Sequence, residues 1–318
     1  MHCLVTGGAG FIGSHLCEYL LAQKHTVVAL DNFNDYYDPR LKRRNVESLL
    51  PRENFKVVEA DILDVTRLQE LFGAHNFEAI IHLAARAGVR PSIAQPLLYE
   101  QVNIQGTMNL LEVARRHKIS KFIFGSTSSV YGENRKLPFS EDDPVDNPIS
   151  PYAATKKACE LICYTYHHLY ALPVSCLRFF TVYGPRQRPD MAIHKFTRLI
   201  AAGQKVPMFG DGSTKRDYTF ITDIIDGVYR ALERCSSYHI YNLGESRTIE
   251  LRALIDLIAK NLGKEARIER LPIQPGDVPM TYADVSRAQR ELGYQPRINI
   301  EEGVHYFVEW FKEAHRLR

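Results

Sequence analysis

Two side chains that could move a proton stand four residues apart, Tyr152 and Lys156, in the segment Tyr-Ala-Ala-Thr-Lys. On a helix this spacing places both side chains on one face. A nearby ammonium stabilises a phenolate and lowers the tyrosine pKa toward working pH, as acid/base catalysis at a hydroxyl group requires. The same spacing also arises by chance as a surface pair, so its meaning depends on the other motifs in the chain.

A glycine-rich segment near the N-terminus supplies the second motif. Gly7, Gly10 and Gly13 follow a short apolar run directly and open an amphipathic pattern over residues 11–21. Glycines at these positions let backbone N–H groups and a helix N-terminus approach a pyrophosphate. The spacing is GxxGxxG and lacks the Lys-Ser/Thr ending of an ATP-binding loop. The strand, turn and helix context therefore predicts a dinucleotide site rather than an ordinary tight turn.

An acidic residue at the end of the second predicted strand indicates which dinucleotide is bound. The Asp31 carboxylate can accept hydrogen bonds from the adenosine ribose hydroxyls and would repel an extra 2′-phosphate, so NAD is expected rather than NADP. Arg40, Lys42 and Arg43 follow and could soften this preference, but we interpret them as a solvated basic turn. Asp61, after the third predicted strand, is placed to meet the adenine edge, with a surface cap of the next helix as the alternative.

Short apolar runs that alternate with helical patterns must position these residues. The predicted strands are residues 3–6, 26–30, 55–60, 79–83, 121–126 and 174–179. Such alternation is typical of βαβ units and of a parallel sheet that is buried on both faces. We therefore predict an α/β fold with a doubly wound parallel sheet of the Rossmann type, and a ligand crevice at the carboxyl ends of the strands.

The rhythm changes after residue 180, where loops that contain Pro and Gly separate shorter elements. Residues 218–242 again read as a helix followed by a strand, which predicts a return to the main sheet. We expect a dinucleotide-binding domain of residues 1–180, rejoined by about 218–242, and a smaller C-terminal substrate-binding domain of 181–217 and 243–318.

Composition limits the class of protein. With 318 residues, 45% apolar content and a net charge of +3, the chain can bury a full core and has no general electrostatic attraction to nucleic acid or to an anionic membrane. The six cysteines form no CxxC pair and are expected to be reduced and structural. Without a signal-peptide pattern or an apolar run of membrane-spanning length, we expect a cytoplasmic enzyme with no nucleic-acid or membrane partner and no metal site.

The order of these segments resembles the extended short-chain dehydrogenase/reductase family over essentially the whole chain. Further matches are His82-Leu83-Ala84-Ala85, Asn103, the segment from Ser126 to Gly132, and the segment from Arg178 to Pro185. The resemblance implies a catalytic set of Thr127, Tyr152 and Lys156. It implies that Lys156 also holds the nicotinamide ribose and that Thr127 hydrogen-bonds the substrate oxygen; the alternative for Thr127 is a hydroxyl that bonds its own backbone. The dinucleotide residues that it implies, together with those above, are Gly7, Gly10, Phe11, Ile12, Gly13, Asp31, Asn32, Asp61, Ile62, Leu83, Ala84, Ala85, Asn103, Tyr152 and Lys156.

Within that family, 4,6-dehydratases carry an Asp-Glu pair where Ser128 and Ser129 stand here, so elimination of water is disfavoured. Residues 31–38, 87–90 and 184–191 are most similar to the UDP-glucuronate 4-epimerases, and relatives that act on UDP-glucose commonly carry Asn at the position of Thr181. The resemblance thus implies NAD-dependent C4 epimerisation of UDP-glucuronate to UDP-galacturonate through a 4-keto intermediate. A UDP-glucuronate decarboxylase, a UDP-glucose 4-epimerase and a dinucleotide-sensing protein without catalysis remain alternatives.

A uronate carboxylate needs a fixed cation, ideally an arginine fork. Arg188 is the first candidate, Arg186 the second and Arg90 the third, each with a solvated loop arginine as the alternative. By resemblance, Arg216 matches the arginine that binds the sugar-nucleotide diphosphate. Asp277 matches the uridine-side loop, although Gln274 stands where many relatives have Arg. The expected substrate residues are Arg90, Thr127, Ser128, Thr181, Arg186, Arg188, Arg216 and Asp277.

Two helical segments resemble a dimer interface of this family. The helices expected near residues 97–115 and 152–170 match those that form a four-helix contact between subunits in the family. We therefore expect a homodimer.

Overall fold

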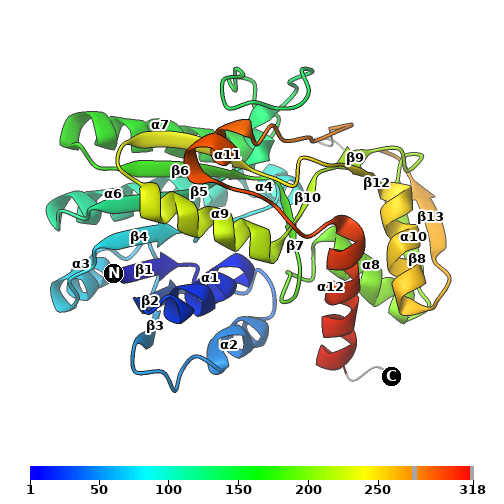
Figure 1. Cartoon of the computed structure of the whole chain (residues 1–318), viewed down its shortest axis with the longest axis horizontal. Helices are drawn as coiled ribbons and strands as arrows, with labels where there is room; N and C mark the ends of the chain where they lie inside the picture. Colours follow the sequence, from blue (N-terminus) through cyan, green and yellow to red (C-terminus); the bar gives the residue numbers. More distant parts are fainter. Residues whose placement is uncertain (274–277, 316–318) are drawn as a thin grey trace.

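The computed structural model describes residues 1–273 and 278–315 and contains a seven-stranded parallel sheet with helices on both faces (Figure 1). The strand order is β11-β6-β5-β4-β1-β2-β3. The strands of this sheet are β1 His2–Thr6, β2 Thr26–Asp31, β3 Phe55–Glu59, β4 Ala79–His82, β5 Lys121–Thr127, β6 Val174–Phe179 and β11 Tyr238–Leu243. The expected doubly wound α/β fold is confirmed, and the six predicted strands occur with bounds that differ by no more than one residue.

Alternating side chains of each strand enter two different cores, which explains why the strands read as continuous apolar runs. In β1, Cys3 and Val5 belong to one hydrophobic cluster, whereas Leu4 belongs to the other. Helices α1 (Phe11–Ala22) and α9 (Ile221–Arg234) cover the first face, and α3 (Val65–Ala74), α6 (Gly106–Arg116) and α7 (Pro151–Tyr170) cover the second (Figure 1). A parallel sheet that is buried on both faces requires this arrangement.

The strand order reverses at β1, which lies between β4 on one side and β2 on the other. The chain leaves β1 toward α1 on one face and leaves β4 toward the opposite face, so a crevice opens between the carboxyl ends of these two strands. The glycine-rich loop follows β1 and Leu83 follows β4. The fold thus brings two of the expected motifs to the same edge.

The chain returns to the main sheet late, as residues 218–242 predict. After α9, β11 pairs in parallel with β6 and becomes the edge strand. The smaller part of the molecule consists of short two-stranded sheets and three long helices beside the sheet (Figure 1). Its elements are β7 Thr181–Tyr183, α8 Ala192–Ala201, β8 Lys205–Phe209, β9 Lys215–Arg216, β10 Tyr218–Phe220, β12 Ile249–Glu250, α10 Leu251–Leu262, β13 Arg267–Leu271 and α12 Ile300–Ala314. Helix α11 (Ser286–Leu292) packs instead against α9 and β11 of the main part (Figure 1).

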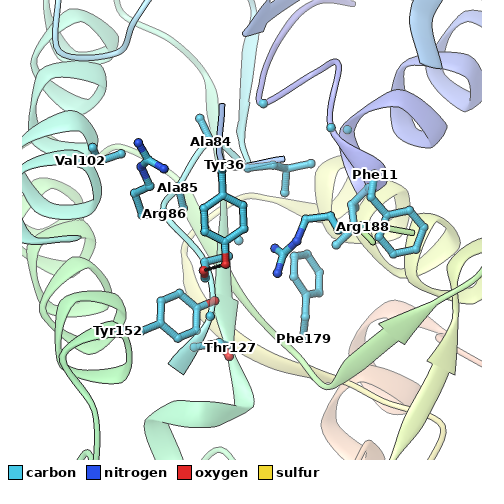
Figure 2. Close-up of a pocket in the computed structure, with 18 of the residues that line it drawn as sticks. Phe11, Tyr36, Ala84, Ala85, Arg86, Val102, Thr127, Tyr152, Phe179 and Arg188 are labelled. Atoms are coloured by element: carbon cyan, nitrogen blue, oxygen red, sulfur yellow. Dashed lines mark hydrogen bonds between the residues drawn. The ribbon is translucent and has the colours of Figure 1, made fainter. Parts of the chain in front are cut away.

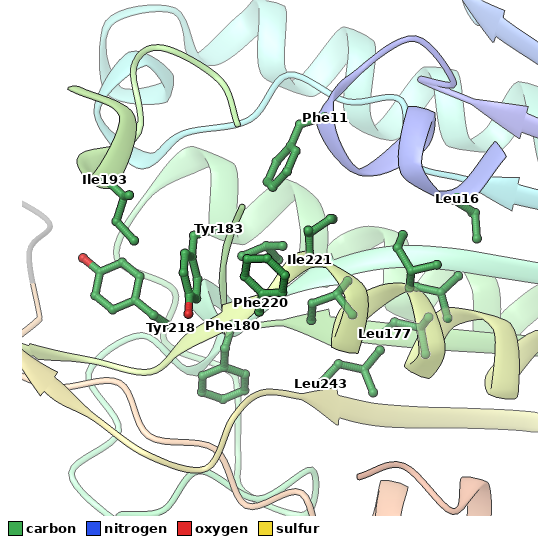
Figure 3. Packing of buried hydrophobic residues seen from close by; sticks show 14 of the residues in the cluster. Phe11, Leu16, Leu177, Phe180, Tyr183, Ile193, Tyr218, Phe220, Ile221 and Leu243 are labelled. Carbon is green, nitrogen blue, oxygen red and sulfur yellow. The ribbon is translucent and has the colours of Figure 1, made fainter. Parts of the chain in front are cut away.

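One hydrophobic cluster runs through both parts of the molecule. It contains Leu16 of α1 and Leu177 of β6 together with Ile193 of α8 and Phe307 of α12. Figure 3 shows part of this cluster, with Phe11 and Leu16 facing a layer of side chains from β6, β7, β10 and β11. The smaller part therefore shares its core with the main sheet.

The helix expected over residues 97–115 is divided into three pieces. They are α5 (Pro96–Tyr99), a π-helical turn η1 (Glu100–Gln105) and α6, preceded by the short α4 (Val89–Ala94). A π-turn adds one residue to a helical turn, and such turns are frequent at functional sites. Here the π-turn contains the buried Asn103. The remaining helical elements are α2 Pro39–Glu47 and the 3-10 turn η2 Ser128–Tyr131.

Among residues 1–273 and 278–315, no helix is long and apolar enough to cross a membrane. In the same residues, no group of three or more His, Cys, Asp or Glu side chains is arranged to hold a metal ion.

Candidate active site

A cavity of about 490 Å³ lies at the carboxyl ends of the strands and collects most of the expected site residues (Figure 2). The expected residues in its wall are Gly7, Gly10, Phe11, Ile12, Gly13, Asp31, Asn32, Asp61, Ile62, Leu83, Ala84, Ala85, Thr127, Ser128, Tyr152, Lys156, Thr181 and Arg188. The motifs that the sequence places far apart therefore line one space.

The glycine loop packs so closely that side chains would not fit. Gly7 has φ +67°, and a Cβ there would lie 2.9 Å from the backbone nitrogen of Ala84. A Cβ on Gly13 would lie 2.1 Å from the Gly7 oxygen. The loop thus presents bare backbone and the N-terminal end of α1 to the cavity, which fits a pyrophosphate group.

Asp31 is held in place at the far end of this cavity. Its carboxylate accepts the backbone N–H groups of Ala9 at 3.3 Å and Phe33 at 2.9 Å. Lys42 lies 3.6 Å from the same carboxylate, and both side chains are only 6% exposed. The interpretation of Lys42 as part of a solvated turn is therefore wrong, because α2 turns this side chain inward. Arg40 is 86% exposed and Arg43 55%, as a solvated turn requires.

Asp61 is not the cap of the next helix, because Asp64 caps α3 by accepting the backbone N–H of Arg67. One carboxylate oxygen of Asp61 accepts the Asn32 side-chain amide at 2.7 Å, and the other accepts the backbone N–H of Leu63 at 2.9 Å. Asp61 thus stabilises its own turn and also anchors Asn32 in the cavity wall. Ile62 beside it is buried against Gly106, where a Cβ would lie 2.4 Å from Ile62.

Tyr152 enters the cavity from the first turn of α7, which Ser150 caps by accepting the backbone N–H of Ala153. Burial raises the pKa of the Tyr152 phenol, and Tyr36 also raises it, whereas a hydrogen bond with Thr127 and the positive charge of Arg188 lower it. Thr127 also accepts the backbone N–H of Ser129 at 3.2 Å, which was its alternative role. The hydroxyl of Thr127 therefore serves the backbone and the phenol together.

Lys156 lies one helical turn after Tyr152 on α7, and both residues line the cavity. Its ammonium donates to the Gly125 carbonyl at 2.7 Å and lies 4.7 Å from the centre of the Phe124 ring. Burial lowers the pKa of Lys156 to about 8, against a smaller opposing effect of nearby thiols and of Glu160. Lys156 is thus a buried cation that titrates close to neutral pH.

A buried ion pair stands behind the end of β5. Glu160 receives two hydrogen bonds from Arg178, each at 2.9 Å, and one from the Ser126 hydroxyl at 2.6 Å. Arg178 also donates to the Tyr131 hydroxyl at 3.0 Å. Burial lowers the pKa of Arg178, but the bonds to Glu160 outweigh it and the pKa is raised. This network fixes the strand end that carries Thr127.

Asn103 does not reach the cavity wall and acts from behind it. Its side-chain oxygen accepts the backbone N–H of Arg86 at 2.8 Å. Its amide group donates to the Arg86 carbonyl at 3.1 Å and to the Thr155 hydroxyl at 3.0 Å. The π-turn therefore ties the loop after β4 to the helix that carries Tyr152.

Arg188 lies in the cavity wall, and its guanidinium points toward Tyr36 (Figure 2). The Arg188 carbon Cζ is 5.3 Å from the centre of the Tyr36 ring. The fork itself binds Asp190, with Nε to Oδ1 at 3.0 Å and Nη2 to Oδ2 at 2.9 Å. The position fits the expected role, but a neighbouring carboxylate already uses two of its N–H groups.

The other arginine candidates lie away from this cavity. Arg186 has φ +64° and forms an ion pair with Glu18 of α1 at 2.8 Å. Arg90 lies over the Phe209 ring, 4.5 Å from its centre. Arg216 lines a separate cavity of about 100 Å³. Asp277 and Gln274 lie outside the described residues.

Two tyrosines that had no expected role contribute to the site: Tyr36 lines the cavity, and Tyr99 is buried next to Tyr152 outside the lining. Tyr36 donates to the Ala87 carbonyl at 2.8 Å, and Tyr99 donates to the same oxygen at 2.7 Å. The Tyr99 ring also packs against the Tyr152 ring, with centres 6.2 Å apart. These contacts join three segments that are distant in the chain, so spacing alone could not have revealed them.

The sequence profile of the family described as GDP-mannose 4,6 dehydratase matches residues 4–307. The chain belongs to this family. It is a family of extended short-chain dehydrogenases/reductases, as the motifs indicate. Within the family, the chain is 45% identical over 311 residues to a UDP-glucuronate 4-epimerase of Thermodesulfobacterium geofontis, over 98% of this chain and 96% of the relative.

Two solved structures have the same fold as this chain. The UDP-glucuronic acid 4-epimerase of Bacillus cereus, solved with UDP-glucuronic acid and NAD, is 38% identical with a TM-score of 0.93, over 99% of this chain and all of the other. The dTDP-glucose 4,6-dehydratase of Streptomyces venezuelae, solved with NAD, also gives a TM-score of 0.93 at 30% identity, over 99% and 98%. Because one fold accommodates both activities, the residues of the site must distinguish them.

Proposed function

We propose that this chain is an NAD-dependent UDP-glucuronate 4-epimerase, which interconverts UDP-glucuronate and UDP-galacturonate. The observation that carries the proposal is one cavity with Tyr152 and Thr127 on one wall and Arg188 beside them. An acid/base for a sugar hydroxyl and a cation for a carboxylate thus face the same space. The relatives named as UDP-glucuronate 4-epimerases support this assignment.

The acid/base step belongs to Tyr152. Its phenolate accepts the proton of the C4 hydroxyl, and the phenol returns the proton to the C4 oxygen after the sugar has turned. Thr127 orients the oxygen by a hydrogen bond, and the charge of Arg188 favours the phenolate against the effect of burial. When bound, NAD would supply a hydride acceptor for C4 and, in its reduced form, the hydride donor that restores the C4–H bond on the opposite face, and its positive nicotinamide ring would also favour the phenolate. Loss of hydride and proton leaves a 4-keto sugar.

The carboxylate decides between epimerase and decarboxylase. A 4-keto uronate is a β-keto acid, which loses CO₂ when its carboxyl bond aligns with the carbonyl π system. Arg188 and the hydroxyls of Thr127 and Ser128 hold the carboxylate out of that alignment. Ser128 and Ser129 also replace the acidic pair that elimination of water would need, which disfavours a dehydratase.

The dinucleotide site extends from the glycine loop to Asp31. The bare backbone at Gly7 and Gly13 accommodates the pyrophosphate. The Asp31 carboxylate accepts hydrogen bonds from the adenosine ribose hydroxyls of NAD. The sugar nucleotide then extends toward the smaller part. The proposal therefore includes two domains. Residues 1–180 with 218–242 bind the dinucleotide, and residues 181–217 with 243–318 bind the sugar nucleotide.

The homodimer is part of this proposal. Several large apolar side chains on α5 and α7 are exposed, including Leu97 at 81%, Leu161 at 56% and Leu169 at 65%. A second copy of the chain would cover them. Light scattering at micromolar concentration should give twice the mass of the chain, and Leu161→Glu should give the single mass; a monomeric wild-type protein would contradict the proposal.

The cytoplasmic location also remains a proposal. All six cysteines are free and buried, which suits a reducing compartment.

Incubation with UDP-glucuronate, followed by NMR of the sugar nucleotides, tests the activity. UDP-galacturonate should accumulate to an equilibrium mixture without net consumption of NAD. Formation of UDP-pentose would instead identify a decarboxylase. Conversion of UDP-glucose but not UDP-glucuronate would identify a UDP-glucose 4-epimerase. If no sugar nucleotide is converted, the remaining alternative is a dinucleotide-sensing protein without catalysis.

A further inference from the structure

A buried lysine lies in the wall of the dinucleotide cavity beside Asp31. The ammonium of Lys42 is 3.6 Å from Asp31 Oδ1 and within 3.3 Å of the backbone and side-chain oxygens of Asn34. It also lies 5.1 Å from the centre of the Tyr37 ring. Asp38 caps the first turn of α2 by accepting the backbone N–H of Arg40, which fixes the helix that carries Lys42.

The pairing changes the electrostatics of the adenosine end. An isolated carboxylate at Asp31 would present a full negative charge to a 2′-phosphate. With Lys42 at 3.6 Å, the pair is neutral at longer range, while the carboxylate oxygens still accept hydrogen bonds. Because both groups are buried, salt screens neither of them effectively. Rejection of a 2′-phosphate by charge is therefore weaker than Asp31 alone would give.

We propose that Lys42 is a specificity-determining residue of the dinucleotide site, and that the choice between NAD and NADP depends on the Asp31–Lys42 pair. Asp31 without Lys42 rejects an adenosine 2′-phosphate more strongly than the pair does. Lys42 without the Asp31 charge leaves a buried cation that attracts the 2′-phosphate. This inference rests on the proposed NAD site and concerns which dinucleotide that site accepts.

A double-mutant cycle tests the pair by binding alone. Wild-type protein, Asp31→Asn, Lys42→Met and the double variant are each equilibrated with equal, excess NAD and NADP. After washing, the bound dinucleotides are released by heat and quantified by chromatography. Separate apparent affinities follow from the dependence of Tm on the concentration of each dinucleotide.

Asp31→Asn should raise the ratio of NADP to NAD affinity roughly tenfold or more, as expected for a charge-assisted contact to phosphate. Lys42→Met should lower this ratio, and the double variant should lose the gain of Asp31→Asn. Lys42→Arg keeps the charge and should stay near the wild-type ratio. Arg43→Met is the matched control, because Arg43 is a neighbouring cation that is 55% exposed and pairs with Glu59; it should leave the ratio unchanged.

The inference is wrong if the double variant keeps the NADP gain of Asp31→Asn, or if Lys42→Met and Arg43→Met behave alike. If Asp31→Asn does not fold, the comparison of Lys42→Met with Arg43→Met still decides. A wild-type protein that binds neither dinucleotide would overturn the proposed function itself. Binding of NAD with ratios that Lys42 does not change would overturn only this inference.

Discussion

The guanidinium of Arg188 binds the carboxylate of Asp190 through two hydrogen bonds, with Nε to Oδ1 at 3.0 Å and Nη2 to Oδ2 at 2.9 Å. Asp190 is 45% exposed and Arg188 is 20% exposed, so the acidic partner is the more solvated of the two. A uronate carboxylate that binds Arg188 must share the guanidinium with Asp190 or displace it. The strength of this pair therefore affects how well the cavity recognises an acidic sugar.

Arg188→Ala should lower kcat/KM for UDP-glucuronate more than for UDP-glucose, because only the uronate loses a carboxylate contact, whereas the weaker support of the Tyr152 phenolate affects both sugars. Loss of a charge-assisted hydrogen bond costs about 1.5–3 kcal/mol, which corresponds to roughly a ten- to hundredfold loss in rate. Steady-state kinetics with both sugars would measure the difference. An equal loss for both would mean that Arg188 serves the Tyr152 phenolate, the diphosphate or the fold and does not recognise the carboxylate.

Asp190→Asn is the matched control for this substitution, because it removes the competing charge and keeps Arg188. It should raise the affinity for UDP-glucuronate relative to UDP-glucose. A fall in that relative affinity would show that Asp190 orients Arg188 and does not compete with the substrate.

Tyr152→Phe should abolish most epimerase activity while the protein still binds NAD. Removal of a general acid/base typically costs about 10²–10⁴-fold in rate. The substitution removes the phenol hydroxyl, whose pKa is lowered by the hydrogen bond with Thr127 and by the charge of Arg188. NMR of the sugar products and chromatography of the bound dinucleotide would measure the two properties separately. Retention of most of the activity would refute the role assigned to Tyr152.

The activity of the wild-type protein should fall on the alkaline side with a midpoint near the pKa of Lys156, about 8. Above that pH the ammonium that donates to the Gly125 carbonyl loses its charge. In Lys156→Arg, any remaining activity should lack this alkaline decline, because guanidinium stays protonated. A pH profile of kcat/KM would show the difference, and an identical decline in both proteins would assign it to another group.

The same lysine should affect stability with a definite sign. Its pKa is lower in the folded chain, about 8, than the ordinary value of 10.5. Between these values the unfolded chain binds more protons, so the free energy of unfolding should rise with pH in this window and fall as pH drops through 8. Urea unfolding of wild type and Lys156→Met would reveal this difference in slope.

Glu160→Gln should destabilise the fold strongly, because it leaves Arg178 as a buried cation without its carboxylate. The side chains of the pair are 0% and 1% exposed. Breaking one partner of a buried pair costs about 3–5 kcal/mol. Urea unfolding would measure it, with Glu112→Gln as a control at a partly exposed glutamate that pairs with Arg115. If both variants lose the same free energy of unfolding, the buried Glu160–Arg178 pair stabilises the fold no more than the partly exposed Glu112–Arg115 pair does.

Much of the fold could be predicted because parallel strands that are buried on both faces have continuous apolar sequences. The glycine loop was recognisable for a similar reason, since bare backbone at Gly7 and Gly13 leaves a direct mark in the sequence. The return of the chain to the main sheet was also predictable, because residues 218–242 show a helical pattern followed by a strand pattern. In the structure these are α9 and β11, and β11 pairs with β6. These features depend on neighbours that are close in the chain.

The parts of the site that could not be predicted depend on contacts between distant loops. Arg188 was ranked before Arg186 and does enter the cavity wall, but the sequence could not show that the left-handed backbone at Arg186 turns that side chain toward Glu18. Lys42 looked like one member of a basic turn until α2 placed it against Asp31. The sequence also could not show that the Lys156 ammonium donates to the Gly125 carbonyl.

The hydrophobic cluster shared by α1, β6, α8 and α12 limits how the enzyme can move. Hinge opening between the main sheet and the smaller part would pull apart apolar surface, at about 25 cal/mol for every Å² exposed. A large apolar contact of this kind opposes rigid-body domain motion. We therefore expect the sugar to reverse its faces between walls that stay packed together, without a hinge opening of the protein.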